Sequence, residues 1–404
     1  MATEPDAPRL TVLIPSWNAA STIERALASV LDEGEVPLEC VVIDDGSTDG
    51  TGDVVQAVAD RDPRVILIRL PDNLGVSKAR NRGLAVARGE WLAFLDADDR
   101  LLPGGIDALM RPTSDPDVLV VVGQRVWTDG ERTWLSPVYD NTDVREPGRK
   151  SIATHLGLLY YASATGKVIH RSLIAGLQFE GRVLGDQPWT IRAMLRASGG
   201  LEVIGDTVYE WSRPHPDRAV QTITAATRSS AERATEIAVM ARTVFADVCA
   251  EIDADIVDEV TRSALKGAYF DRLVRSDLSG PVKAALDRRD PATGQLYGAV
   301  AAFLESAPAS VLATSDLLIT HLLRPPARRW TELIPSARSS YWEMVRPAFR
   351  ADRRMARRIA WYRVVTPAYM LARRFGAPRG TAAASVILSV VATARRIVLR
   401  FRRS

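Results

Sequence analysis

Short apolar segments alternate with amphipathic segments along the first hundred residues. Four apolar runs have the length and the β-branched content of buried strands. Three longer segments between them carry apolar residues three and four positions apart, as helices do. The strands are predicted at residues 10–14, 40–43, 65–68 and 91–95, and the helices at residues 21–31, 49–59 and 76–87. This repetition of strand, helix and strand predicts an α/β fold, with a mostly parallel sheet and helices on both faces.

Beyond about residue 228 the pattern becomes helical. Apolar residues recur at helical spacing in residues 229–250, 256–277, 294–304 and 310–323. The last segment, residues 324–404, holds 19 Arg, no Lys and three acidic residues, a net charge of +16. Because the whole chain carries +3, residues 1–323 carry −13. We predict three parts: an α/β domain at residues 1–225, a helical accessory domain at residues 226–323, and a basic amphipathic tail at residues 324–404.

Polar residues cluster where three of the predicted strands end. Residues 15–18 (PSWN) follow the first strand, residues 44–51 (DDGSTDGT) the second, and residues 96–99 (DADD) the fourth. Since ligands of parallel α/β sheets bind beyond the carboxyl ends of the strands, these clusters predict a binding site. For three of the residues, capping of the following helix is an equally good explanation: Ser47, Thr48 and Asp49.

The acidic cluster after the fourth predicted strand has the composition of a metal site. Asp96 and Asp98 stand two positions apart, with Asp99 beside them. Carboxylates that are partly desolvated and unpaired are unfavourable, and a divalent cation relieves their repulsion. Oxygen ligands favour Mg²⁺ or Mn²⁺, which commonly share their coordination with substrate phosphates. We therefore expect Asp98 and Asp96 to bind Mn²⁺ or Mg²⁺.

Three segments together resemble the family-2 glycosyltransferases of the GT-A fold. They read TVLIPSWNAASTIERALASVL, VVIDDGSTDGT and NLGVSKARNRGLAVARGEWLAFLDADD, and the resemblance extends from residue 9 to about residue 215. It implies an inverting transfer of a hexosyl or N-acetylhexosaminyl group from a nucleoside-diphosphate sugar, usually UDP-linked. In the family the D-x-D acids hold a metal on the diphosphate. This makes Asp98 the metal ligand and puts Asp96 beside the metal or at the ribose.

The resemblance also assigns residues to a nucleotide-sugar pocket. It implies that Asp45 or Asp44 accepts the N3–H group of the base. Further residues would line the same pocket or lie near the diphosphate: Pro15, Ser16, Asn18, Lys78, Arg80 and Asn81. The sequence supports Lys78 and Arg80 independently, because their helix follows a loop at the strand ends. Solvated helix charges are the alternative for both.

An inverting transfer needs a carboxylate that accepts the proton of the attacking hydroxyl group. The family usually carries a Glu-Asp pair before a helix, and the matching residues here are Gly185 and Asp186, followed by Gln187 and Pro188. If Asp186 aligns with the base, only a supporting carboxylate is lost, and we favour this alignment. If Asp186 aligns with the Glu, Gln187 replaces the base and activity is in doubt. A helix N-cap is the structural alternative for Asp186.

Two functions remain open from the sequence. The first is an active glycosyltransferase whose acceptor is a cell-envelope glycan, a polyol-phosphate polymer or a lipid-linked molecule. The second is a degenerate GT-A domain that binds nucleotide or glycan as a scaffold, suggested by Gly185. Stacking on sugar rings and core packing both remain open for three tryptophans: Trp127, Trp134 and Trp189.

The basic tail suggests where the protein works. Neither an N-terminal signal nor a spanning segment is expected, and the apolar residues 382–394 are flanked by Arg. Arg and aromatic residues with such a run suit the anionic surface of a membrane. Nucleic acid is a weaker candidate partner, because the remaining chain is acidic. We expect a cytoplasmic protein at the inner face of the cell membrane, with a homo-oligomer as an open question.

Overall fold

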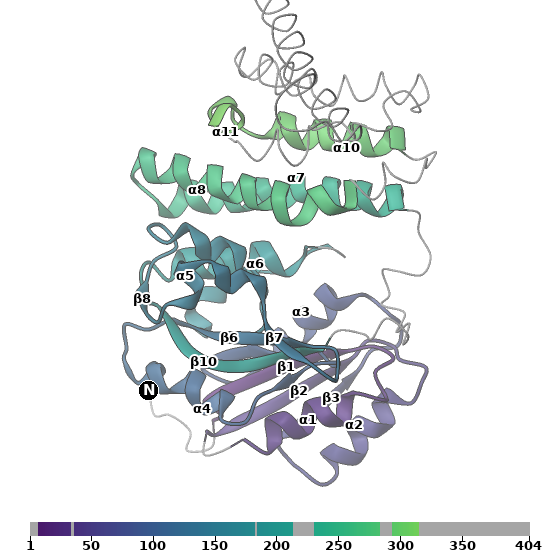
Figure 1. Cartoon of the computed structure of the whole chain (residues 1–404). Helices are drawn as coiled ribbons and strands as arrows, with labels where there is room; N and C mark the ends of the chain where they lie inside the picture. Colours follow the sequence, from purple (N-terminus) through teal and green to yellow (C-terminus); the bar gives the residue numbers. More distant parts are fainter. Residues whose placement is uncertain (1–6, 34–35, 182–183, 213–229, 283–292, 315–404) are drawn as a thin grey trace, which may run out of the picture. The chain divides into compact units, whose positions relative to one another are not determined.

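The computed structural model describes residues 7–33, 36–181, 184–212, 230–282 and 293–314 (Figure 1). The chain forms two compact units. The first comprises Met1–Thr222 with Asp247–Val257, and the second comprises Ile223–Ala246 with Asp258–Ser404. The predicted tail at residues 324–404 and the predicted boundary near residue 225 lie outside the described residues.

A single mixed sheet forms the centre of the first unit. Its main path runs β3-β2-β1-β4-β9-β6-β10-β5, with β7 paired to β6 and β8 paired to β10. The first four strands along this path are parallel, whereas β9 is antiparallel to both β4 and β6. The strands are β1 Leu10–Ser16, β2 Leu38–Asp44, β3 Val65–Arg69, β4 Trp91–Phe94, β5 Arg100–Leu101, β6 Val120–Thr128, β7 Thr133–Leu135, β8 Gly148–Lys150, β9 Lys167–His170 and β10 Leu201–Ser212. The parallel sheet predicted from the first hundred residues is confirmed, and the antiparallel strands extend it.

Helices cover both faces of the parallel strands, as predicted. Helix α1 buries an apolar stripe at helical spacing, which includes Ile23, Leu27 and Val30. Helix α3 packs against β1 and β2, where Gly83 has no room for a side chain beside Leu13. The helices are α1 Ile23–Leu31, α2 Thr51–Ala59, α3 Val76–Val86, α4 Gly105–Met110, α5 Thr142–Arg145 and α6 Asp186–Arg196, with short 3₁₀ turns η1 Arg111–Ser114, η2 Pro137–Asp140, η3 Leu156–Tyr160 and η4 Arg171–Ile174.

The strand order fixes the position of a binding site. The chain moves outward from β1 through β2 to β3, and then returns through α3 to β4, on the other side of β1. Crossovers of this kind are right-handed, so α3 lies on the face opposite α1 and α2 (Figure 1). The order therefore reverses between β1 and β4, and ligands of open α/β sheets bind beyond the carboxyl ends of such strands.

The described part of the second unit is helical, as the sequence predicted. Phe270 and Phe303 stack with ring centroids 5.1 Å apart, and Phe245 packs against both. Among the residues that the structure describes, no helix is long and apolar enough to cross a membrane. The helical elements are α7 Ser230–Asp255, whose last turns belong to the first unit, α8 Glu259–Arg272, the π-helical turn η5 Leu273–Leu278, α10 Thr293–Ser306 and α11 Ala309–Thr314.

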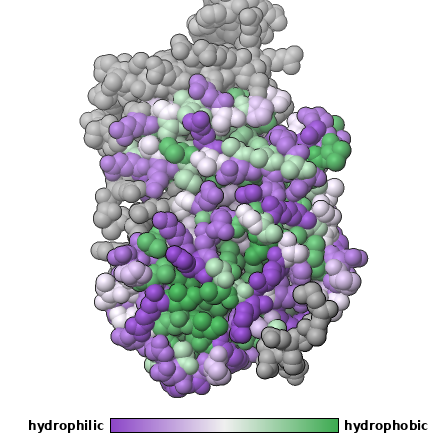
Figure 2. Space-filling view, turned by 180° about the vertical axis from the view of Figure 1, so that it is seen from behind, coloured by the Kyte–Doolittle hydropathy of each residue, from purple (hydrophilic) through white to green (hydrophobic). Residues whose placement is uncertain are grey.

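Some large apolar side chains of the first unit remain at the surface. Figure 2 shows hydrophobic residues gathered in one area of the molecule, bordered by hydrophilic ones. Leu135 in β7 and Trp211 in β10 are exposed, and their strands both pair with β6. These two side chains therefore lie on two strands that flank β6, one on each side.

Candidate functional site

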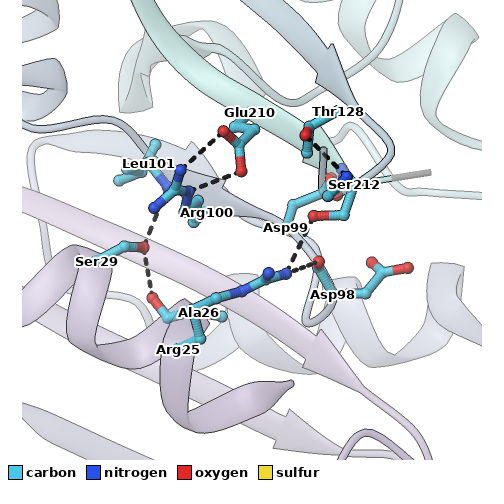
Figure 3. Close-up of polar contacts among 11 residues, drawn as sticks. Arg25, Ala26, Ser29, Asp98, Asp99, Arg100, Leu101, Thr128, Glu210 and Ser212 are labelled. Carbon is cyan, nitrogen blue, oxygen red and sulfur yellow. Dashed lines mark hydrogen bonds and ion pairs between the residues drawn. The ribbon is translucent and has the colours of Figure 1, made fainter. Parts of the chain in front are cut away.

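The acidic residues that follow β4 form a tight turn, which we call the acid loop (residues 96–99). The N–H group of Asp99 donates to the carbonyl oxygen of Asp96 over 3.0 Å. Arg25 of α1 donates through Nη2 to the carbonyl oxygen of Asp98 over 2.6 Å and to Oγ of Ser212 over 3.0 Å (Figure 3). The loop is thus tied to α1 and to the end of β10 through its backbone. The carboxylate of Asp98 remains exposed.

Asp99 anchors the acid loop from the inside. It is only 1% exposed, and its carboxylate accepts the hydroxyl of Tyr209 over 2.6 Å and the N–H group of Ser212 over 2.8 Å. Burial, followed by the charges of Asp96 and Asp98, raises the pKa of Asp99 to about 9. Next to it, Arg100 forms a two-pronged ion pair with Glu210 (Figure 3). Sequence reasoning missed this anchor, because Tyr209 and Ser212 stand more than a hundred positions away.

The carboxylates of Asp96 and Asp98 lie on the same short loop as Asp99, and the charge of Asp96 acts on Asp98. Loss of hydration, followed by the charge of Asp96, raises the pKa of Asp98. No three His, Cys, Asp or Glu side chains in the described residues come together as a complete metal site. Two carboxylates suit a cation such as Mg²⁺, which keeps several ligands for water and substrate phosphates.

Arg80 of α3 forms an ion pair with the acid loop through Asp96. Its Nη2 lies 2.9 Å from Oδ1 of Asp96, and its guanidinium lies within 6 Å of the ring centroids of Phe94 and Phe179. Arg80 is only 6% exposed, so the alternative of a solvated helix charge is wrong for this residue. Lys78, two positions earlier, is exposed. The buried cation therefore balances part of the negative charge of the acid loop.

The residues predicted to surround the nucleotide meet at the ends of β1 and β2. Both oxygens of the Asp45 carboxylate accept backbone N–H groups, from Leu74 and Gly75, over 2.8 Å each. The neighbouring Asp44 is buried and accepts the N–H group of Ser47 over 3.1 Å. In the structure these two carboxylates shape the loops that would enclose a base.

The first strand contributes the other wall of this region. Pro15 and Ser16 are the last residues of β1, and Oγ of Ser16 donates to the carbonyl oxygen of Ile43 over 3.3 Å. Asn18 adopts a positive φ of 49° and makes two hydrogen bonds with the loop after β2: its backbone N–H group donates to Oγ of Ser47, and its Oδ1 accepts the N–H group of Thr48. The predicted residues of β1 and β2 are therefore brought together.

Asn81, predicted near the diphosphate, forms a reciprocal pair with the backbone of Phe179. Its Nδ2 donates to the carbonyl oxygen of Phe179, and its Oδ1 accepts the N–H group of Phe179, each over 2.9 Å. Phe179 in turn stacks on Trp189, which is 1% exposed. The amide of Asn81 thus holds together two segments of the unit, and core packing is the role of Trp189.

Asp186 is the first residue of α6, with Gly185 as the N-cap. Its carboxylate is half-buried and has no hydrogen-bond or ion-pair partner among the described residues, so it is not a helix cap. A Cβ atom at Gly185 would lie 2.4 Å from the carbonyl oxygen of Glu180 and 2.6 Å from Oγ of Ser77. A glutamate cannot occupy this position without movement of the backbone. These close contacts explain why a glycine occupies position 185. They leave the Asp186 carboxylate available to a ligand.

A reversing α/β sheet with an acid loop at the reversal point is the arrangement of the GT-A class of fold. Residues 11–177 match the model of Glycosyl transferase family 2. Among solved structures, residues 1–349 of S. aureus TarS, determined in complex with UDP-GlcNAc, align with a TM-score of 0.65 and 19% identity, covering 86% of this chain and 92% of that chain.

Curated relatives match part of the chain. The succinoglycan biosynthesis protein ExoO of Rhizobium meliloti is 46% identical over 24% of this chain and 27% of its own length. The putative teichuronic acid biosynthesis glycosyltransferase TuaG of Bacillus subtilis is 42% identical over 23% of this chain and 37% of its own length. An uncharacterized protein of Mycobacterium tuberculosis is 37% identical over 32% and 40%. The chain therefore spans less than half the length of these relatives.

Proposed function

We propose that this chain is an inverting glycosyltransferase that moves a sugar from a UDP-linked donor to an acceptor of the cell envelope. The proposal is carried by two carboxylates: Asp98, which is exposed beyond β4, and Asp186 at the start of α6, which has no hydrogen-bond or ion-pair partner among the described residues. Relatives named for succinoglycan and teichuronic acid biosynthesis support the acceptor class. The fold match to a protein solved with UDP-GlcNAc supports the donor class.

Asp98 and Asp96 would hold Mn²⁺ or Mg²⁺ against the donor diphosphate. Such a cation neutralises the charge that develops on the leaving diphosphate. Asp98 offers its carboxylate directly, whereas Asp96 is already shared with Arg80. The fixed position of the acid loop, held by Asp99 and Tyr209, keeps these oxygens in place without reorganisation.

Asp186 would act as the general base. The acceptor hydroxyl transfers its proton to the Asp186 carboxylate while its oxygen forms the bond to the anomeric carbon. The bond from that carbon to the diphosphate breaks on the opposite face, and the nucleoside diphosphate leaves with its electron pair. Because Asp186 has no hydrogen-bond or ion-pair partner among the described residues, its oxygens are open to an acceptor hydroxyl.

The scaffold alternative rests on Gly185 in place of a glutamate. The close contacts at Gly185 give this residue a packing reason, which favours the active enzyme. Release of UDP from UDP-sugars in the presence of Mn²⁺ separates the two functions, since a scaffold binds the donor without turnover. If the chain is an active enzyme, release of UDP should require both Asp98 and Asp96.

The test uses Asp98→Asn, with Asp60→Asn as a control at an exposed carboxylate in the turn after α2. We expect UDP release in wild type and in the control, and loss of metal-dependent donor affinity in Asp98→Asn with an unchanged thermal unfolding curve. Donor affinity equal to wild type in Asp98→Asn contradicts the metal assignment. Donor binding without UDP release in wild type supports the scaffold.

For its location, we propose attachment of the cytoplasmic protein to the inner face of the membrane through residues 324–404. The net charge of +16 and the apolar residues 382–394 support this, since each Arg near an anionic surface contributes about 1 kcal/mol. A lipid-linked or polymeric acceptor at that surface would then be within reach of the enzyme. We propose no nucleic acid partner. Size-exclusion chromatography of the full chain would show whether the protein self-associates.

A further inference from the structure

Three tryptophans from three neighbouring strands meet at one part of the sheet, and we call Trp127, Trp134 and Trp211 the tryptophan cluster. Trp127 in β6 lies opposite Trp211 in β10 and opposite Trp134 in β7. Its ring centroid is 5.1 Å from that of Trp211 and 6.3 Å from that of Trp134, with the rings edge to face. Trp211 is 38% exposed. The cluster is thus open to solvent at Trp211, unlike the core residue Trp189.

The tryptophan cluster borders the acid loop. Tyr209 donates its hydroxyl to Asp99, and side chains along a strand alternate between faces. Trp211 therefore lies on the same face as Tyr209, about 7 Å further along β10. Ser212, the next residue, donates its N–H group to Asp99. A ligand on the Trp211 ring would lie beside the residues that are proposed to hold the donor.

A stack of cations and rings extends from the tryptophan cluster to Lys167. The guanidinium of Arg125 lies 5.7 Å from the ring centroid of Trp211 and 4.6 Å from that of Tyr161. Nζ of Lys167 lies 3.3 Å from the same Tyr161 centroid. Burial, followed by the charge of Arg125, lowers the pKa of Lys167 well below its ordinary value. The cluster therefore continues into the unit as alternating rings and cations.

Arg125 also has hydrogen-bonding capacity in reserve. Its Nη1 donates to Oγ of Ser163 over 2.7 Å, while Nε is buried without a partner in the described part of the chain. An arginine has five N–H donors in a fixed plane. The site thus combines aromatic surface with a guanidinium group.

We propose that the tryptophan cluster is the acceptor subsite and binds a pyranose ring of a carbohydrate acceptor, with Trp211 as its main platform. The proposal rests on the proposed transferase function. A pyranose presents an apolar C–H face that packs on an indole ring, and its hydroxyl groups need donors such as Arg125. A ring held here lies beside the acid loop, to which Tyr209 and Ser212 of the same strand are bonded.

The test is saturation-transfer NMR on the full chain with UDP and Mn²⁺, using maltotriose and triacetylchitotriose as probes. Trp211→Leu removes the ring, Trp211→Tyr keeps an aromatic ring, and Leu135→Ala is the control at a neighbouring exposed apolar residue. We expect binding weaker by on the order of tenfold in Trp211→Leu, a smaller loss in Trp211→Tyr, and no change in Leu135→Ala.

Release of UDP by hydrolysis of the donor is measured in the same samples, and the control Leu135→Ala should release UDP at the wild-type rate. Equal binding of the probes by wild type and Trp211→Leu overturns the acceptor subsite, as does a wild type that binds neither probe at millimolar concentration. A lower unfolding temperature in Trp211→Leu with unchanged binding assigns the tryptophan cluster to packing. A wild type that releases no UDP contradicts the proposed function instead, whatever the NMR result.

Discussion

Replacement of Gly185 by alanine is expected to destabilise the first unit, although Gly185 has an ordinary backbone conformation. Its φ is −67°, so alanine suits the backbone angles and only the added methyl group matters. That Cβ atom would lie 2.4 Å from the carbonyl oxygen of Glu180 and 2.6 Å from Oγ of Ser77, where ordinary contacts begin at 3.4 Å. Because the carbonyl belongs to the backbone, the segment before α6 has to move. Overpacking of this kind costs about 1–3 kcal/mol.

The assay is thermal unfolding followed by circular dichroism. A loss of that size lowers the unfolding temperature of a unit of about 200 residues by roughly 2–12 °C. Gly205→Ala is the matched control, because a Cβ atom there meets only the side chain of Pro147, at 3.3 Å. The control should unfold close to the wild-type temperature.

The glutamate of the family provides a sharper version of the same test. Gly185→Glu should unfold at a lower temperature than Gly185→Ala, and its UDP release should fall because Asp186 follows directly and moves with the backbone. Suppose instead that Gly185→Glu unfolds at the wild-type temperature and turns over faster. The packing explanation of Gly185 is then refuted, and the alignment that gives Gln187 the position of the base regains support.

Three further results are expected. Burial and the charges of Asp96 and Asp98 raise the pKa of Asp99 from 3.8 to about 9, so only the unfolded state releases this proton between those values. In metal-free buffer, stability should therefore fall as pH rises from 4 to 9, and urea unfolding of Asp99→Asn should show a shallower decline; parallel pH profiles contradict this. Asp186→Asn should lower turnover about 10²–10⁴-fold with donor affinity unchanged in titration calorimetry, whereas a wild-type rate places the base elsewhere. Removal of residues 324–404 should release the protein from anionic vesicles at physiological salt and leave UDP release intact; equal sedimentation of both forms with the vesicles contradicts the membrane assignment.

Local patterns predicted the parallel half of the sheet well. Strands β1, β2 and β4 are buried apolar runs, β3 is a partly buried one, and single helices connect them, so strand and helix boundaries follow from residues that are close in the chain. The other half depends on pairing between distant segments. Strand β9 inserts antiparallel between β4 and β6, and no spacing in the sequence indicates such an insertion. The start of α6 at Asp186 does not follow from a local pattern either, since Gly185 and Asp186 do not show helical periodicity.

In the candidate site too, residues that are close in sequence were predicted and contacts between distant segments were not. The residues of the acid loop were predicted as a group, because they are neighbours in sequence. Their supports were not predicted: Arg25 comes from α1 and Tyr209 from β10, and each is joined to the loop only by the fold. Asn81 was assigned to the diphosphate from its motif, and its amide pairs with the backbone of Phe179. A sequence motif thus identified Asn81 as a residue of this region, but it did not show that its amide bonds to the backbone of Phe179.

The reciprocal pair between Asn81 and Phe179 has a consequence for the design of shorter proteins. It joins residues 98 positions apart, and Tyr209 joins Asp99 over 110 positions. Contacts of such separation form only after long loops have closed, so this unit gains its stability late and as a whole. A fragment that ends at residue 177, where the family match ends, lacks Phe179, Trp189 and β10. A fragment that folds on its own therefore has to be longer than residues 11–177, the part that matches the family model.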